Sequence, residues 1–177
     1  NPMRMDIEEM GKMVGIDLAF NVILNSKKDI LHAFIDTPIE VMRSGIRFSE
    51  TYYNPFGHAA KFYYGNDLEK YAYKLKVTKE PGSEYYYNNG NTLILAMIIE
   101  KTTGMRFTEY FEQKIWSKIG TAYPANWNYD SEKHGMVKAF CCLNASTLDF
   151  ARFGRLYLHM GEWEGNQVVP KEWVEFS

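Results

Sequence analysis

The sequence has no long apolar stretch, no block of basic residues and almost no cysteine. Its longest apolar run, Leu93 to Ile99, spans seven positions, whereas a helix that crosses a membrane needs about 20. The net charge is only −2 and the basic residues form no stripe, so nucleic acid and anionic membranes are not expected partners. We therefore expect no transmembrane segment. The start, Asn1 to Asp6, lacks the apolar core of a secretion signal, but a cleaved leader would leave no trace, so the compartment stays open.

Scarce cysteine and histidine limit disulfide and metal chemistry. The two cysteines, Cys141 and Cys142, are neighbours, a spacing that does not suit an ordinary structural bridge. We therefore expect them to be two small buried hydrophobic side chains. The four histidines show no spacing of paired metal ligands, so we expect no metal site and no cofactor.

Helical spacing of apolar residues dominates what is present, and a length of 177 residues fits one domain, 1–177. The expected helices cover residues 6–25, 29–35, 55–63, 68–75, the stretch from an Asn89 or Asn91 cap to Gly104, Phe107 (with a Thr108 cap) to Gly120, Ser146 to Gly161, and Pro170 onward. Only Trp163 to Val169 has the pattern of a β-hairpin. The expected fold class is therefore predominantly α, with a small β-hairpin near the C-terminus. Because the chain stops inside a helical pattern, we expect a truncated polypeptide.

One polar, aromatic loop leads directly into the most apolar helix. It runs from a turn at Pro81-Gly82 to Asn91, and Leu93 to Ile99 follow without a polar side chain, so this helix is expected to be buried on most sides. Loops held rigidly by buried elements often carry binding and catalytic residues. Tyr87 and Asn89 are therefore candidate site residues, although Tyr87 could equally be a half-buried aromatic, as most of the 13 tyrosines should be.

Two further regions have alternative interpretations. Eight aromatic residues lie between Tyr52 and Tyr73, and their helical spacing favours a core over the lining of a cleft. Residues 121–143 show no sustained period and are expected to form a long loop, which in a compact domain usually borders a functional site.

Five motifs follow one another from Met42 onward. They are Met42-Arg43-Ser44-Gly45-Ile46, the segment from Pro81-Gly82 to Tyr87-Asn88-Asn89, Thr103-Gly104 to Ile119-Gly120, Ala145 to Gly154, and Trp163 to Trp173. In type and order they resemble the serine β-lactamase-like hydrolases: class C β-lactamases, penicillin-binding carboxypeptidases, related esterases and 6-aminohexanoate-dimer hydrolases. The resemblance covers about three quarters of the chain, residues 42–177.

This resemblance implies the helical portion of the α+β serine β-lactamase-like fold. In that family the serine of a Ser-x-x-Lys motif attacks an amide or ester carbonyl and forms an acyl-enzyme. The tyrosine of Tyr-x-Asn shuttles a proton and the asparagine orients the amide of the substrate, which assigns these roles to Tyr87 and Asn89. The implied partner is a small-molecule amide, ester or peptide substrate.

The sequence departs from the family at the nucleophile. None of its eight serines is followed three residues later by lysine, and the later Lys-Thr-Gly or His-x-Gly strand is absent. Lys101-Thr102-Thr103-Gly104 is a near match, but it ends a predicted helix, and residues 1–41 are not matched. We therefore expect a partial chain that is inactive alone. The alternatives are a non-catalytic descendant that binds a ligand or peptide, and a purely structural helical domain.

Overall fold

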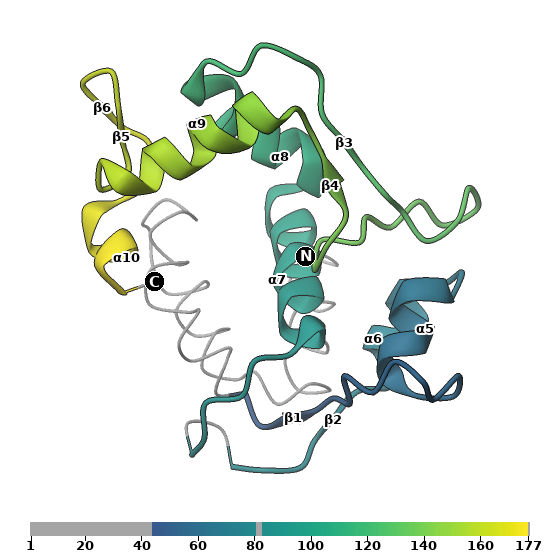
Figure 1. Ribbon diagram of the computed structural model, residues 1–177. Helices are drawn as coiled ribbons and strands as arrows, with labels where there is room; N and C mark the ends of the chain where they lie inside the picture. The colour runs from purple at the N-terminus through teal and green to yellow at the C-terminus, as the bar shows by residue number, and fades with distance from the viewer. Residues whose placement is uncertain (1–43, 81–82, 177) are drawn as a thin grey trace.

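The computed structural model describes residues 44–80 and 83–176 and is shown in Figure 1. The helices predicted at 6–25 and 29–35 and the Pro81-Gly82 turn lie outside the described residues. The helices within them are α5 (His58–Tyr64), α6 (Leu68–Ala72), α7 (Asn89–Thr103), α8 (Phe107–Lys114), a 3-10 helix (Trp116–Ile119), α9 (Thr147–Leu158) and α10 (Lys171–Phe176). None of these is long and apolar enough to cross a membrane.

Strands occur in the described ranges only as two-residue antiparallel pairs. β1 (Ile46–Arg47) pairs with β2 (Lys76–Val77), β3 (Asn126–Trp127) with β4 (Leu143–Asn144), and β5 (Glu162–Trp163) with β6 (Asn166–Gln167). The β5–β6 pair is the hairpin predicted near the C-terminus. Helices therefore provide most of the regular structure that is described.

Helix α7 is central because its stretch from Leu93 to Ile99 carries no polar side chain. It contacts both α6 and α8, and α8 lies next to its C-terminal end (Figure 1). Six of the seven residues from Leu93 to Ile99 are buried, Leu95 being half-buried. One core cluster joins α7 to β1, α5 and α6, and a second surrounds Trp116, Leu156 and Trp163. The expectation of a helix buried on most sides is confirmed.

Local capping rules place most helix ends. Asp67 accepts the Lys70 N–H, Ser146 accepts the Asp149 N–H, and Gly104 ends α7 with a left-handed φ of 68°. The single helix predicted from Phe107 to Gly120 is divided: α8 ends at Lys114, and a separate 3-10 helix follows and ends at Gly120, with φ of 65°. Other helix ends also differ from the prediction: α6 ends at Ala72 rather than Leu75, α8 is capped at Arg106 rather than Thr108, and α9 ends at Leu158 rather than Gly161.

Helix α5 begins three residues later than the predicted start at Pro55. The Asn54 side chain accepts the Phe56 N–H, and the Asn54 carbonyl accepts the Gly57 N–H, which closes a turn before the helix. The prediction that the aromatics of residues 52–73 form a core is only half right. Phe62 is buried, whereas four others are exposed: Tyr52, Tyr53, Phe56 and Tyr64.

The neighbouring cysteines form a disulfide, so the prediction of two separate buried thiols is wrong. Cys142 has a left-handed φ of 70°, and this conformation brings the two sulfur atoms together within a single turn of chain. Both residues are half-buried. The predicted loop 121–143 is otherwise largely irregular, apart from β3, the first residue of β4 and a bridge between Tyr129 and Val137.

Candidate functional site

The segment 44–50, which contains β1, forms the support on which the Tyr87-Asn88-Asn89 motif lies. Successive side chains of an extended chain point to opposite sides. Ser44, Ile46 and Phe48 are buried, whereas Arg47 between them is exposed. Continuing the same alternation brings Glu50 to the buried side, facing the start of α7.

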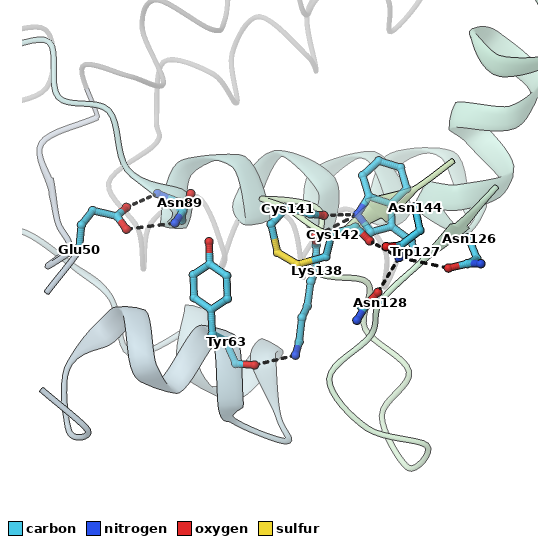
Figure 2. Close-up of a disulfide and its surroundings, with 10 residues drawn as sticks. All are labelled: Glu50, Tyr63, Asn89, Asn126, Trp127, Asn128, Lys138, Cys141, Cys142 and Asn144. Carbon is cyan, nitrogen blue, oxygen red and sulfur yellow. Dashed lines mark hydrogen bonds between the residues drawn. A yellow bond between two sulfur atoms is a disulfide. The ribbon is translucent and has the colours of Figure 1, made fainter. Parts of the chain in front are cut away.

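Two polar side chains of this segment hold the first residues of α7. Glu50 accepts the Asn89 backbone N–H at 2.9 Å and the Asn89 Nδ2 at 3.0 Å (Figure 2). The Ser44 hydroxyl donates to Asn91 Oδ1 at 2.9 Å. In addition, the Tyr86 hydroxyl donates to the Phe48 carbonyl at 3.4 Å. The segment and the motif are thus fastened together at three points.

The helix cap is Asn88 rather than the predicted Asn89 or Asn91. Asn88 Oδ1 accepts the Asn91 N–H at 2.9 Å. Asn89 is already the first residue of α7, with its side-chain NH₂ donating to Glu50, and Asn91 lies further into the helix. Asn88, Asn89 and Asn91 are all buried, so each of these polar side chains needs the partner that it has.

Tyr87 and Asn89, the two candidates from the sequence, have very different surroundings. The Tyr87 side chain is 58% exposed, and within the described ranges its hydroxyl makes no hydrogen bond. Asn89 is 4% exposed. The neighbours of Tyr87, Tyr86 and Asn88, help to line a cavity of about 150 Å³ together with Ser44, Arg47 and Lys79, whereas Tyr87 does not. Tyr87 is therefore an accessible phenol on a rigidly held loop, outside the core.

The sequence did not point to Glu50 or Tyr52, which lie beside the motif. The Tyr52 hydroxyl donates to Glu50 Oε2 at 3.0 Å. This hydrogen bond is the main cause that raises the pKa of Tyr52 to about 12, with partial desolvation and Tyr63 adding to it. Tyr52 therefore stays a protonated donor at neutral pH. The signal that could have found Glu50 is the period-two pattern Ile46, Phe48, Glu50, which continues from β1.

The disulfide lies in a loop that is bonded to both α5 and β3. Lys138 Nζ donates to the Tyr63 carbonyl at 2.7 Å, and Trp127 Nε1 donates to the Cys141 carbonyl (Figure 2). Asn144 Nδ2 donates to the Cys142 carbonyl at 3.1 Å. The Tyr63 ring in turn contacts the Tyr52 ring, at 5.6 Å between centroids. Ring and backbone contacts thus connect the disulfide loop with the surroundings of Glu50.

A buried carboxylate, Asp149, organises the other end of the long loop. It accepts the Ala122 N–H at 2.9 Å, the Ser146 hydroxyl at 2.8 Å and Arg152 at 2.7 Å. Chiefly through the Ala122 N–H, these donors lower the pKa of Asp149 despite the opposing effect of burial. Its surroundings are those of a structural anchor at the start of α9.

Comparison with known proteins shows which proteins the chain is similar to. The Beta-lactamase family model matches residues 41–164. A 6-aminohexanoate-dimer hydrolase from Paenarthrobacter ureafaciens is 30% identical over 112 residues, which cover 63% of this chain and 28% of that protein. The solved structure of a "putative 6-aminohexanoate-dimer hydrolase from Bacillus anthracis" aligns with a TM-score of 0.67 at 30% identity, over 78% of this chain and 39% of that chain.

A further solved structure, the octameric penicillin-binding protein homologue from Pyrococcus abyssi, aligns with a TM-score of 0.49 at 19% identity, over 94% of this chain and 46% of that one. The chain thus spans 28% of the curated relative and 39% of the Bacillus anthracis structure. The family match covers more than half of the chain and includes the segment 44–50 and the Tyr87-Asn88-Asn89 motif. The chain belongs to the beta-lactamase family.

Proposed function

We propose that the protein is a serine hydrolase that cleaves small amide or ester bonds through an acyl-enzyme, and that this chain contributes Tyr87 and Asn89 to the site. The observation that carries the proposal is the exposed Tyr87 hydroxyl on a loop fixed at Asn89 by Glu50. The names of the relatives, 6-aminohexanoate-dimer hydrolases, favour linear amides as the substrate class.

The proposed reaction assigns Tyr87 the proton transfers. A serine oxygen attacks the carbonyl carbon, and its proton passes to the Tyr87 phenolate. The proton then moves to the leaving nitrogen or oxygen as the carbon–nitrogen or carbon–oxygen bond breaks. Water releases the acyl group in a second step with the same proton path in reverse. Asn89 would orient the amide of the substrate.

The chain by itself does not supply all the parts of this reaction. A tyrosine with a pKa of about 10 is almost wholly protonated at neutral pH, so it needs a nearby cation to act as a base. The sequence has no Ser-x-x-Lys motif to provide the nucleophile and that cation. We therefore expect residues 1–177 alone to form no acyl-enzyme.

Covalent labelling tests this proposal. Residues 1–177 and the product of the natural reading frame that encodes them are each incubated with a fluorophosphonate and with a penicillin, and intact masses are measured. We expect no adduct on residues 1–177 and one adduct per molecule on the natural product. A stoichiometric adduct on any of the eight serines of residues 1–177 would show that a nucleophile lies within this chain and would overturn the assignment.

The missing Ser-x-x-Lys motif also favours a second candidate, a descendant of the family that binds a ligand or peptide without cleaving it. The same samples separate the two functions. A natural product that binds a linear amide in calorimetry, but takes up no label and releases no amine, would support the binding function. Label uptake together with release of the amine would exclude it.

A further inference from the structure

We infer that Glu50 is the positioning residue of this site: its carboxylate fixes Asn89 and, through Asn89, sets the place of the Tyr87 hydroxyl. This inference rests on the proposed function for its catalytic consequence, but its structural part stands on the described contacts. Glu50 and Asn89 are 39 positions apart in sequence, so the contact depends on the fold.

Glu50 immobilises both the backbone and the side chain of Asn89. Oε1 accepts the backbone N–H at 2.9 Å, and Oε2 accepts Nδ2 at 3.0 Å. Two bonds from one carboxylate to one residue leave little freedom for rotation of either group. The orientation of the Asn89 amide also follows from this pairing, because an ionised carboxylate only accepts hydrogen bonds and must face the amide nitrogen.

The position of the carboxylate also suits the helix. The Asn89 N–H belongs to the first turn of α7, where backbone donors have no partner within the helix. The first turn of α7 contains no acidic residue of its own. Glu50 therefore supplies from a distant segment both the acceptor and the negative charge that a helix N-terminus favours.

Tyr87 depends on this support because its own side chain makes no hydrogen bond in the described ranges. Its place is set by the backbone between Tyr86, which is bonded to the Phe48 carbonyl, and Asn89. Because Asn89 is buried, loss of its partner would leave two polar groups unsatisfied and favour a shift of the loop. A displacement of Tyr87 by about 1 Å can lower the rate about 100-fold.

Glutamine is the sharpest substitution because it keeps the shape of Glu50 and changes its hydrogen bonding. Glu50 accepts from three donors: the Asn89 N–H, Asn89 Nδ2 and the Tyr52 hydroxyl. In Glu50→Gln one oxygen becomes an NH₂ group, which cannot accept from any of them. Glu50→Asp retains a carboxylate and serves as the conservative variant. Glu80→Gln is the matched control, because Glu80 is an exposed carboxylate whose side chain makes no hydrogen bond among the described residues.

The structural part is tested by amide hydrogen exchange on residues 1–177. In Glu50→Gln we expect the Asn89 N–H to exchange at least about ten-fold faster than in the parent, because its acceptor is weakened. Glu80→Gln should leave that rate unchanged. An unchanged Asn89 rate in Glu50→Gln, or an equal rise in Glu80→Gln, would overturn the inference. If Glu50→Gln does not fold, the same comparison is made with Glu50→Asp.

The catalytic part is tested by steady-state kinetics on the natural gene product with a linear amide. We expect Glu50→Gln to lower kcat by about 10- to 100-fold with little change in KM, because Glu50 acts through Asn89 and Tyr87. Glu50→Asp should recover part of kcat, and Glu80→Gln should match the parent. An active parent whose kcat is unchanged by Glu50→Gln would contradict the positioning role.

The hydrogen-exchange and kinetic experiments together distinguish failure of this inference from failure of the proposed function. A parent protein without hydrolysis or labelling would refute the proposed function, while the exchange rate of Asn89 would still decide whether Glu50 holds the motif. A rise in KM with kcat unchanged would instead place Glu50 in substrate binding and would also contradict positioning through Asn89.

Discussion

Asn88, Asn89 and Asn91 have the same side chain but three different partners. The first accepts an N–H of its own helix, the second donates to Glu50, and the third accepts from the Ser44 hydroxyl. Local capping rules recognise all three residues as suitable. Glu50 and Ser44 belong to a distant segment, and their contacts leave Asn88 as the cap. The role of each asparagine therefore depends on tertiary contacts that a local pattern does not contain.

The disulfide gives a prediction for Cys142, whose backbone is left-handed with φ of 70°. Cys142→Gly and Cys142→Ala both remove the bond, but only glycine adopts this conformation without strain. We expect the alanine variant to be less stable by about 1 kcal/mol in chemical denaturation, because a left-handed conformation penalises a side chain. Equal stabilities would mean that residue 142 leaves the left-handed region once the bond is absent.

At the scale of the element, α7 concentrates the packing of the first core, and the candidate site lies at its N-terminus. Ile98 is 7% exposed within the cluster that joins α7 to β1, α5 and α6. Tyr87 precedes the same helix but is exposed and has no hydrogen bond in the part of the chain that is described. Burial therefore distinguishes residues that stabilise α7, such as Ile98, from Tyr87, which is exposed and is supported by the helix.

Two substitutions test this separation. Ile98→Ala should lower the free energy of unfolding by about 2 to 5 kcal/mol, because it removes buried methyl groups and leaves a cavity. Tyr87→Phe should change it by less than about 0.5 kcal/mol, as for other surface changes. Chemical denaturation of both variants gives the comparison. Losses of similar size would mean that the Tyr87 hydroxyl contributes to the core, which would favour the structural interpretation of the motif.

Elements with strong local signals could be predicted, and those decided by distant partners could not. The caps at Asp67 and Ser146 and the stops at Gly104 and Gly120 depend on residues a few positions apart. The delayed start of α5 depends on which acceptors Asn54 offers in a turn. Glu50 was missed because its partner is 39 positions away. Tyr87 and Asn89 could be proposed from the motif, but their opposite exposures follow only from the folded chain.

At the scale of the whole molecule, the response to pH combines groups from opposite ends of the described chain. His58 accepts the Ser49 N–H through Nδ1 at 3.1 Å and stacks on Phe48. Burial, followed by the charges of Lys61 and Arg47, lowers the pKa of His58 below its ordinary value of 6.5. Asp149, beside the second core, has a pKa lowered from 3.8. In both cases the folded state resists protonation more than the unfolded state does.

Stability should therefore fall in two steps as the pH is lowered. A group whose pKa is lower in the folded state contributes its stabilisation fully above the unfolded pKa and loses it as the pH falls toward the folded pKa. The first step should begin near pH 6.5 from His58, and the second below pH 3.8 from Asp149. Urea denaturation at a series of pH values measures both.

His58→Asn, which keeps an acceptor near the position of Nδ1 but does not titrate, should remove the first step only. Asp149→Asn should be less stable at neutral pH, because the neutral amide replaces one acceptor oxygen by a donor. It should also lack the second step, because the amide does not titrate. A first step that persists in His58→Asn would assign it to another group and contradict the role of His58.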